Sequence, residues 1–176
     1  DLARDVGIAP STAGIWLSML EASGQVALLE PWFSNRSKSL VKSPKLYLTD
    51  TGLLCALLNI RSVEALRQSP SNGPVWETSV YAQLRHRERR AGRSGSLFFW
   101  RDRTREVDFV ADVGGRLELI EAKWAELPDD GDCGSLRVVR EAVGRDRVAR
   151  AAIACRTAQG YPLADGMEAV PGGELS

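Results

Sequence analysis

The amino-acid sequence predicts an α/β protein made of two units. Residues 1–70 open with a helix-turn-helix pattern, followed by short strand-like runs and short helices. Residues 71–176 then give helix, three strands, helix and strand, the order expected of an α/β sandwich with a mixed sheet. Between the two units, the segment "SPSNGP" at 69–74 is dense in turn-forming residues and is the best candidate for a linker.

The first unit has the element order of a winged helix-turn-helix. After a short helix, "LARDV", the helix "TAGIWLSMLEASG" is expected to be capped by Ser11 or Thr12. Two strand-like runs follow, "QVALLEPW" and "KSPKLYLTD", with a basic loop between them at 35–42. Another helix, "TDTGLLCALLNI", is expected to be capped within "TDTG", by Thr49 or Thr51, with Asp50 in a structural role.

The second unit begins with a long helix, "VWETSVYAQLRHRERRAG", in which Trp76, Val80 and Leu84 recur at helical spacing. "SLFFWRD" follows as a strand. "EVDFVADVGGRLELIEAKW" is predicted to be a hairpin, because Gly114 and Gly115 separate two alternating runs, as tight turns prefer. An arginine-rich helix, "SLRVVREAVGRD", and a buried strand, "VARAAIAC", complete the order.

Charge is segregated along the chain, although the 23 basic and 23 acidic side chains cancel. Eight arginines and two acids occupy residues 85–105, whereas nine acids and two bases occupy residues 106–134. A basic block beside an acidic block suits a cation-binding centre with basic flanks for a polyanion. Solvated helix faces give the same pattern, so charge alone does not decide between the two interpretations.

The sequence argues against a membrane protein, because no run approaches the roughly 20 apolar residues that cross a bilayer. The cysteines Cys55, Cys133 and Cys155 are odd in number and lack metal-like spacing, so we expect reduced thiols in a cytoplasmic protein. The chain opens on Asp1 and not on Met, so we expect it to be a piece of a longer protein.

The segment "LIEAKW" at 119–124 holds an unusual pair of charges. Glu121 and Lys123 lie two residues apart in a strand, so their side chains share a face, and Lys123 is the only lysine after residue 45. Asp108, on the other hairpin arm, is expected to approach Glu121. Two carboxylates this close repel and raise each other's pKa unless a divalent cation holds them, and oxygen ligands favour Mg²⁺ or Mn²⁺ over zinc.

A lysine suits such a site, because it is a compact charge that can steady a metal-bound hydroxide or a phosphorane-like transition state. The alternative is an ordinary ion pair between Glu121 and Lys123 at the end of the strand, since an acid-x-lysine tripeptide is a weak signal by itself. Asp108 favours the chemical interpretation, and Glu77 on the preceding helix adds a fourth polar group.

These residues resemble the PD-(D/E)xK restriction-endonuclease-like superfamily, with an acid on a helix (Glu77), the aspartate of "EVDF" (Asp108) and the Glu-x-Lys of "IEAK". More closely, residues 1 to about 125 resemble the C-terminal region of a family of prokaryotic AAA-type ATPases. The segments that carry this resemblance are "LARDVGIAPSTAGIWLSMLEASG", "SPKLYLTDTGLL", "WETSV", "FFWRD" and "REVDFV…LELIEAK".

The resemblance implies an upstream AAA ATPase domain, a winged helix-turn-helix, and then a restriction-endonuclease-like α/β sandwich. It implies that Asp108 and Glu121 hold Mg²⁺ or Mn²⁺ and that Lys123 is the catalytic lysine. Glu77 would assist as an auxiliary metal ligand or as a partner of the metal-bound water. The chain has no Walker A loop, so ATP would bind only in the absent upstream domain.

DNA contacts are expected outside the helix-turn-helix itself, whose second helix carries no arginine or lysine to read bases. Positive charge lies in the wing loop and beside the predicted metal site, where it would contact phosphates and not sequence. The candidate DNA-binding residues are Arg36, Lys38, Lys42, Arg101, Arg103 and Arg105. The first unit is equally suited to docking a protein.

Two functions follow from these expectations. The first is Mg²⁺-dependent hydrolysis of DNA by the C-terminal module of an AAA-type ATPase, with Lys123 offsetting the developing charge. The second is a non-catalytic module that couples the ATPase to DNA or to a protein partner, and a purely structural interaction domain is a weaker third interpretation. Either function is compatible with a homo-oligomer.

Overall fold

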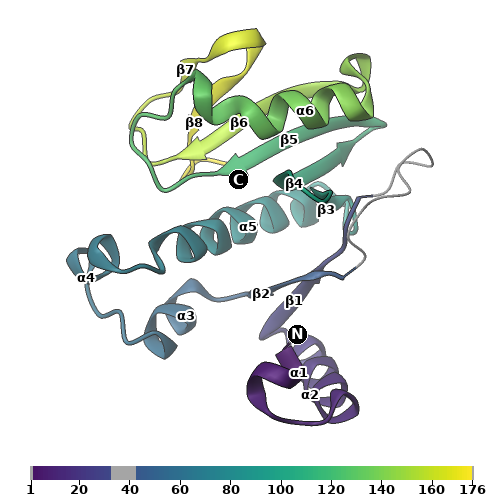
Figure 1. Ribbon diagram of the computed structural model, residues 1–176, viewed down its shortest axis with the longest axis vertical. Coiled ribbons are helices and arrows are strands. Elements are labelled where there is room, and N and C mark those ends of the chain that lie inside the picture. The colour runs from purple at the N-terminus through teal and green to yellow at the C-terminus, as the bar shows by residue number, and fades with distance from the viewer. Residues whose placement is uncertain (1, 33–42, 176) are drawn as a thin grey trace.

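The computed structural model describes residues 2–32 and 43–175, and its largest feature is a mixed six-stranded sheet (Figure 1). The strand order is β3-β4-β5-β6-β8-β7. Strands β3, β4 and β5 are antiparallel neighbours, β6 and β8 run parallel to β5, and β7 is antiparallel to β8. The bounds are β3 Leu97–Arg101, β4 Glu106–Val113, β5 Arg116–Ala122, β6 Val148–Cys155, β7 Tyr161–Pro162 and β8 Glu168–Pro171. The prediction of an α/β protein with a mixed sheet is confirmed.

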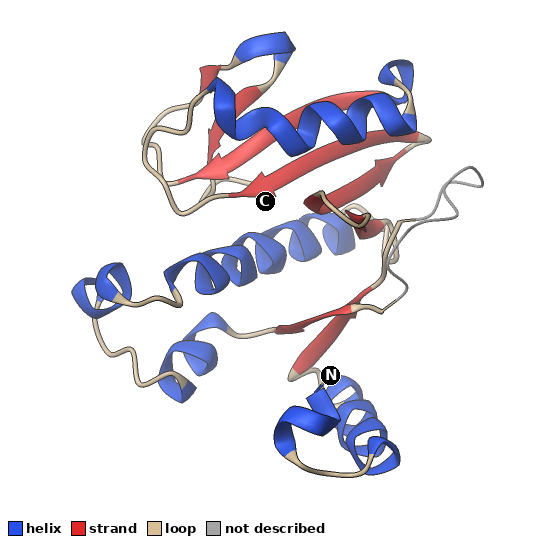
Figure 2. Ribbon diagram, in the orientation of Figure 1, coloured by secondary structure: helices blue, strands red, loops and turns tan. Residues whose placement is uncertain are grey.

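Helices cover both faces of this sheet (Figure 2). Helix α5 (Asn72–Arg90) packs on one face and helix α6 (Gly134–Val143) on the other. Successive side chains of β5 point to opposite faces of the sheet, so this strand contributes to both hydrophobic cores. Leu119 packs on the α6 side, whereas Ile120 packs on the α5 side with Leu84. The sheet therefore forms the middle layer, and each face is closed by one amphipathic helix.

The N-terminal part forms a smaller, more open arrangement at the far side of α5 (Figure 1). Its elements are α1 Leu2–Val6, α2 Pro10–Ala22, β1 Val26–Leu29, β2 Lys45–Leu48, α3 Thr51–Leu57 and α4 Val63–Gln68. Strands β1 and β2 pair antiparallel. No helix within the described ranges has the length and apolar character needed to cross a bilayer.

The β1–β2 hairpin is attached to the main sheet along the edge strand β3. The Phe99 N–H donates to Glu30 O at 3.1 Å, and the Trp32 N–H donates to Phe99 O at 2.6 Å. On the other side, the Tyr47 ring of β2 stacks on Tyr81 of α5 with centroids 4.2 Å apart. The hairpin is therefore held between β3 and α5, and this position brings side chains of β2 to the main domain.

Two helices begin earlier than the sequence suggested. Helix α5 starts at Asn72, so half of the predicted linker at 69–74 is helical. Pro74 lies in the first turn of the helix, where its missing N–H costs no hydrogen bond. Helix α2 likewise begins on a proline, Pro10, ahead of the predicted caps.

Helix α3 is capped within the predicted segment "TDTG", but the capping residue is Asp50 and not a threonine. The Asp50 carboxylate accepts a hydrogen bond from Leu53 N at 2.9 Å, and neither Thr49 nor Thr51 is the N-cap. An aspartate at this position satisfies a free N–H and places negative charge at the positive end of the helix.

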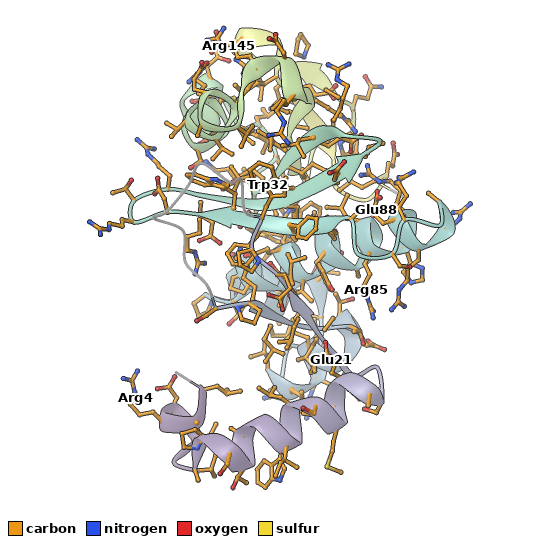
Figure 3. All side chains as sticks on the ribbon, turned by 90° about the vertical axis from the view of Figure 1, so that its right-hand side faces the viewer. Arg4, Glu21, Trp32, Arg85, Glu88 and Arg145 are labelled. Atoms are coloured by element: carbon orange, nitrogen blue, oxygen red, sulfur yellow. The ribbon has the colours of Figure 1, made fainter. Side chains whose placement is uncertain are left out.

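Glu88 is a buried charge near the end of α5 (Figure 3), with a side chain only 3% exposed. Arg87 Nε donates to its Oε1 at 2.9 Å, while Arg93 Nε and Ser96 Oγ donate to its Oε2 at 2.7 and 2.8 Å. Burial acts to raise the pKa of Glu88, but these hydrogen bonds outweigh it and lower the pKa to about 2. The network ties the end of α5 to the turn before β3.

Gly172, just after β8, should not tolerate a side chain. A Cβ there would lie 2.3 Å from Trp76 Cζ2, and the Trp76 Nε1–H is fixed by a hydrogen bond to Ala154 O at 3.0 Å. We expect Gly172→Ala to lower the free energy of unfolding by about 1–3 kcal/mol in urea denaturation. Gly173→Ala is the matched control, since nothing lies within 4 Å of its added Cβ. Equal losses in both variants would contradict the packing described.

The Glu88 network should make stability depend on pH. Since the folded-state pKa is lowered from 4.5 to about 2, ionised Glu88 stabilises the fold above pH 4.5, and this contribution is lost as pH falls toward 2. We expect Glu88→Gln to cost about 3 kcal/mol at pH 7, and the difference from the unmodified chain to shrink in urea denaturation below pH 4. Glu141→Gln, at an exposed pair with Arg145, should change stability by less than about 0.5 kcal/mol. If the difference in unfolding free energy between Glu88→Gln and the unmodified chain stayed constant down to pH 2.5, Glu88 would not have the lowered pKa described.

Candidate functional site

Asp108 and Glu121 lie opposite each other on β4 and β5. The pair Phe109–Ile120 is in register, and one further step along the hairpin places Asp108 beside Glu121. The Ala122 N–H donates to Asp108 Oδ2 at 3.0 Å. The two carboxylates that the sequence singled out are therefore brought together at one end of the hairpin.

A slip in the β3–β4 register directs Asp108 toward α5. The pairing changes from Phe98–Val110 to Trp100–Val107, which leaves one extra residue in β4. Val107 and Val110 both pack on the α6 side, so the alternation of β4 is interrupted between them. Asp108 can thus reach the α5 side, where Lys45 of the N-terminal hairpin lies.

Lys45 is the centre of the acidic cluster, which we define as Glu77, Glu106 and Asp108. Its Nζ lies 2.8 Å from Glu77 Oε1 and 3.0 Å from Asp108 Oδ1, and it also pairs with Glu106. Only 13% of the Lys45 side chain and 12% of the Asp108 side chain are exposed. Three elements, β2, β4 and α5, therefore meet at one buried ammonium.

Tyr47 adds a second contact from β2 to the cluster. Its hydroxyl donates to Glu77 Oε1 at 2.5 Å. Burial raises the pKa of Tyr47, and the charge of Glu77 raises it further, so the phenol keeps its proton. Lys45 and Tyr47 are two residues apart on β2, so their side chains lie on the same face of the strand.

The charges of the cluster stabilise one another. Burial alone would lower the pKa of Lys45, but the charges of Asp108 and Glu77 outweigh it and raise the pKa above its ordinary value. Burial and the charge of Glu77 raise the pKa of Asp108, which Lys45 partly offsets. Burial also acts to raise the pKa of Glu106, but hydrogen bonds from Arg101 and Lys45 lower it. Lys45 is thus a permanent cation among carboxylates.

Glu121 is the uncompensated member of the site. Its Oε2 is buried and has no hydrogen-bond partner in the described part of the chain. Burial, followed by the negative charge of Asp108, raises the pKa of Glu121 well above its usual range, so its carboxyl group is protonated near neutral pH.

Lys123 does not join the two hairpin carboxylates. It lies just beyond the end of β5, and its Nζ pairs with Asp132 of the 3₁₀ turn Asp130–Cys133. The hydrogen bond from Lys123 lowers the pKa of Asp132. The Lys123 side chain is 41% exposed. Neither the predicted catalytic placement beside Asp108 nor the alternative Glu121–Lys123 ion pair is therefore present in this arrangement.

The arrangement does not fit a divalent metal as it stands. The oxygen donors of Asp108 and Glu121 have the chemistry that Mg²⁺ and Mn²⁺ prefer, and the orphaned oxygen of Glu121 could serve as a ligand. The Lys45 ammonium, however, already neutralises the cluster. Among the described residues, no three acidic, histidine or cysteine side chains are grouped so that they could hold an ion. The metal site at Asp108 and Glu121 stays a prediction.

The predicted DNA contacts fall into three sets. The wing-loop residues Arg36, Lys38 and Lys42 lie outside the described residues. Arg101 is engaged within the protein, with its Nε 2.5 Å from Glu106 Oε2. Arg103 and Arg105 are exposed on the turn between β3 and β4, and neither forms an ion pair within the described ranges.

Sequence reasoning did not identify Lys45 and Tyr47 as part of the site. Lys45 is 63 residues from Asp108 along the chain, and its strand, "KLYL", is short. One signal was available, because Lys45 and Lys123 are the two lysines on either side of a long lysine-free stretch in an arginine-rich chain.

Removing the Lys45 charge should destabilise the protein strongly. We expect Lys45→Met to lower the free energy of unfolding by about 3–5 kcal/mol at pH 7, since it leaves three crowded carboxylates without their counter-charge. The loss should be smaller at pH 5, where those carboxylates bind protons more readily. Lys123→Met removes an equal charge from a more exposed pair and should cost less than about 1 kcal/mol. Urea denaturation of both variants measures this, and similar losses would refute a central role for Lys45.

Comparison with known proteins places the chain in a family. No solved structure matches it. The uncharacterized protein Rv2008c of Mycobacterium tuberculosis and the uncharacterized protein Mb2031c of Mycobacterium bovis are each 34% identical over 176 residues. These matches cover 99% of this chain but only 38% of each relative. Residues 1–64 match the model of a domain of unknown function, DUF8612. Because residues 72–175, more than half of the chain, match the model of another domain of unknown function, DUF4143, the chain belongs to the DUF4143 family.

Proposed function

We propose that the chain is a non-catalytic, DNA-directed module of an AAA-type ATPase, which couples the ATPase to nucleic acid without cutting it. One observation carries this proposal. The Lys45 ammonium lies among Glu77, Glu106 and Asp108, in the place where a hydrolytic site would need a free cation-binding pocket. A buried, ion-paired lysine of this kind holds two parts of a protein together. It also occupies the position that a catalytic metal ion would need.

The structural part of the proposal is that residues 1–70 form a winged helix-turn-helix and residues 71–176 a restriction-endonuclease-like domain. The order of elements supports it, since two helices and a β1–β2 hairpin precede a mixed sheet with a helix on each face. The ends of β4 and β5 carry Asp108 and Glu121 side by side, as the resemblance implies.

The DNA-directed part rests on the exposed bases. Arg103 and Arg105 project from a surface turn without an ion pair in the described residues, so both are free to contact phosphates. Arg36, Lys38 and Lys42, which the sequence predicts to lie in a wing loop, would supply further basic side chains. Such contacts would increase the affinity for DNA with little dependence on its sequence, and their contribution would decrease as the salt concentration rises.

The link to an ATPase rests on the sequence resemblance and on the length of the relatives, of which this chain spans 38%. The chain has no Walker A loop of its own. Any ATP-driven step would therefore belong to another part of the full-length protein.

A Mg²⁺- or Mn²⁺-dependent nuclease is the second candidate. It is favoured by the Asp108–Glu121 pair and by the buried Glu121 oxygen that lacks a partner. This function requires a different arrangement, in which Lys45 leaves the acidic cluster and Lys123 leaves Asp132.

DNA binding without cleavage is the expected outcome. Fluorescence anisotropy with a labelled duplex in EDTA should give an affinity that falls with salt, with a log–log slope of about −0.9 for each phosphate contacted. Arg103→Gln and Arg105→Gln should each reduce that slope by about 1, whereas the exposed Arg67→Gln on α4 should leave it unchanged. Binding that does not respond to salt would remove the DNA-directed part of the proposal.

The same preparation decides between the two candidates when it is incubated with plasmid and oligonucleotides in Mg²⁺ or Mn²⁺. We expect no cleavage above the level of a Lys123→Ala variant. Cleavage that is lost in Lys123→Ala would establish the nuclease and overturn the non-catalytic assignment.

A further inference from the structure

One face of α5 carries side chains at successive four-residue intervals, namely Glu77, Tyr81, Arg85 and Arg89. The first two have partners in the N-terminal hairpin. Glu77 accepts from Lys45 and Tyr47, and Tyr81 stacks on Tyr47. The same face then continues into two arginines, and neither has an ion pair in residues 2–32 or 43–175.

These arginines line a pocket of about 200 Å³ between α5 and the hairpin. Leu28 and Leu29 of β1 form an apolar wall, and Tyr81 lies among the lining residues with Ser94 of the turn that follows α5. The pocket is thus apolar on one side and strongly basic on the other. It is too small for a large ligand, but it has room for a phosphoryl group and the first atoms of its ester.

The one acid in the pocket wall cannot neutralise the arginines. Both oxygens of Glu88 are already used by Arg87, Arg93 and Ser96. Arg87 itself is shared with Glu118, its Nη2 lying 2.7 Å from Glu118 Oε2. The charges of this neighbouring network therefore balance among themselves and leave Arg85 and Arg89 uncompensated.

Tyr81 supplies a neutral donor beside the arginines. Burial raises its pKa, so the hydroxyl keeps its proton at physiological pH. The ring is fixed by stacking on Tyr47, and no described residue forms a hydrogen bond with its hydroxyl. Glu21 near the end of α2 (Figure 3) lies close enough for its charge to raise the pKa of Tyr81 as well, but it forms no ion pair with Arg85 or Arg89 in the described residues.

We propose that this pocket binds a phosphate ester, with Arg85 and Arg89 holding the phosphoryl oxygens, Tyr81 and Ser94 donating hydrogen bonds, and Leu28 and Leu29 contacting the organic part. Two guanidinium groups one helical turn apart match the several acceptor oxygens of a phosphate better than the two of a carboxylate. The site is separate from the acidic cluster and requires no hydrolysis. The phosphate-ester proposal rests on the proposed function only if the ester is part of a polynucleotide.

Isothermal titration calorimetry of the 176-residue chain with phenyl phosphate tests the site, with benzoate as the carboxylate probe of the same shape. Arg85→Gln and Arg89→Gln should each weaken phenyl phosphate binding by about tenfold, the effect of losing one charge-assisted hydrogen bond. Arg90→Gln, on the same helix but outside the pocket, should change it by less than about twofold. Tyr81→Phe, which keeps the stacking ring, should weaken it by about threefold.

A short oligonucleotide distinguishes the two sources of the ester. If phenyl phosphate does not bind but Arg85→Gln and Arg89→Gln weaken the oligonucleotide and Arg90→Gln does not, the phosphate belongs to a polynucleotide and the pocket assignment holds. Equal effects of all three substitutions, benzoate binding as tight as phenyl phosphate, or no effect on either probe would overturn it. Circular dichroism confirms that each variant is folded.

These experiments distinguish an error in the pocket assignment from an error in the proposed function. If the oligonucleotide binds in a salt-dependent way and responds to Arg103→Gln but not to the pocket variants, the pocket assignment is wrong and the DNA-directed module stands. If phenyl phosphate binds through Arg85 while no oligonucleotide binds, the pocket stands and the DNA-directed module does not.

Discussion

The ammonium of Lys45 determines how the two parts of this chain fit together. A buried charge is stable only when opposite charges surround it, and here Glu77 comes from α5 whereas Glu106 and Asp108 come from β4. The N-terminal hairpin that carries Lys45 therefore has one favourable position, between β3 and α5. The hydrogen bonds of Glu30 and Trp32 to Phe99 and the stacking of Tyr47 on Tyr81 hold the hairpin in that same position.

The charge balance of the cluster explains the state of its neighbours. Three carboxylates face two cations, Lys45 and Arg101, so one negative charge remains. Burial and then the negative charge of Asp108 raise the pKa of Glu121, and Lys45 only partly offsets them, so this fourth carboxylate is easier to keep neutral than ionised. A divalent ion would change this balance, but it would have to compete with an ammonium that is already paired with all three acids. In this arrangement the acidic cluster is therefore occupied by an ion-paired lysine.

Whether a contact could be predicted from the sequence depends on how far apart along the chain the contacting residues lie. Strand alternation and the Gly114-Gly115 turn were enough to place Asp108 near Glu121, because the hairpin is local. Strand β8, "EAVP", was missed because it is short and ends in a proline. The partner of Lys123 was missed because Asp132 lies in a loop whose path no periodicity describes. Lys45 was missed because its partners are set by the docking of a hairpin, and docking leaves no local pattern in the chain.

Tyr47 links the acidic cluster to the basic pocket. Its hydroxyl donates to Glu77, and its ring stacks on Tyr81, which lines the basic pocket together with Arg85. Strand β2 cannot move without displacing both contacts, and any such movement also shifts Leu28, since β1 and β2 are paired. The apolar wall of the pocket and the Lys45 ion pairs thus come from the same hairpin. The position of that hairpin therefore sets both the shape of the basic pocket and the placement of Lys45 in the acidic cluster.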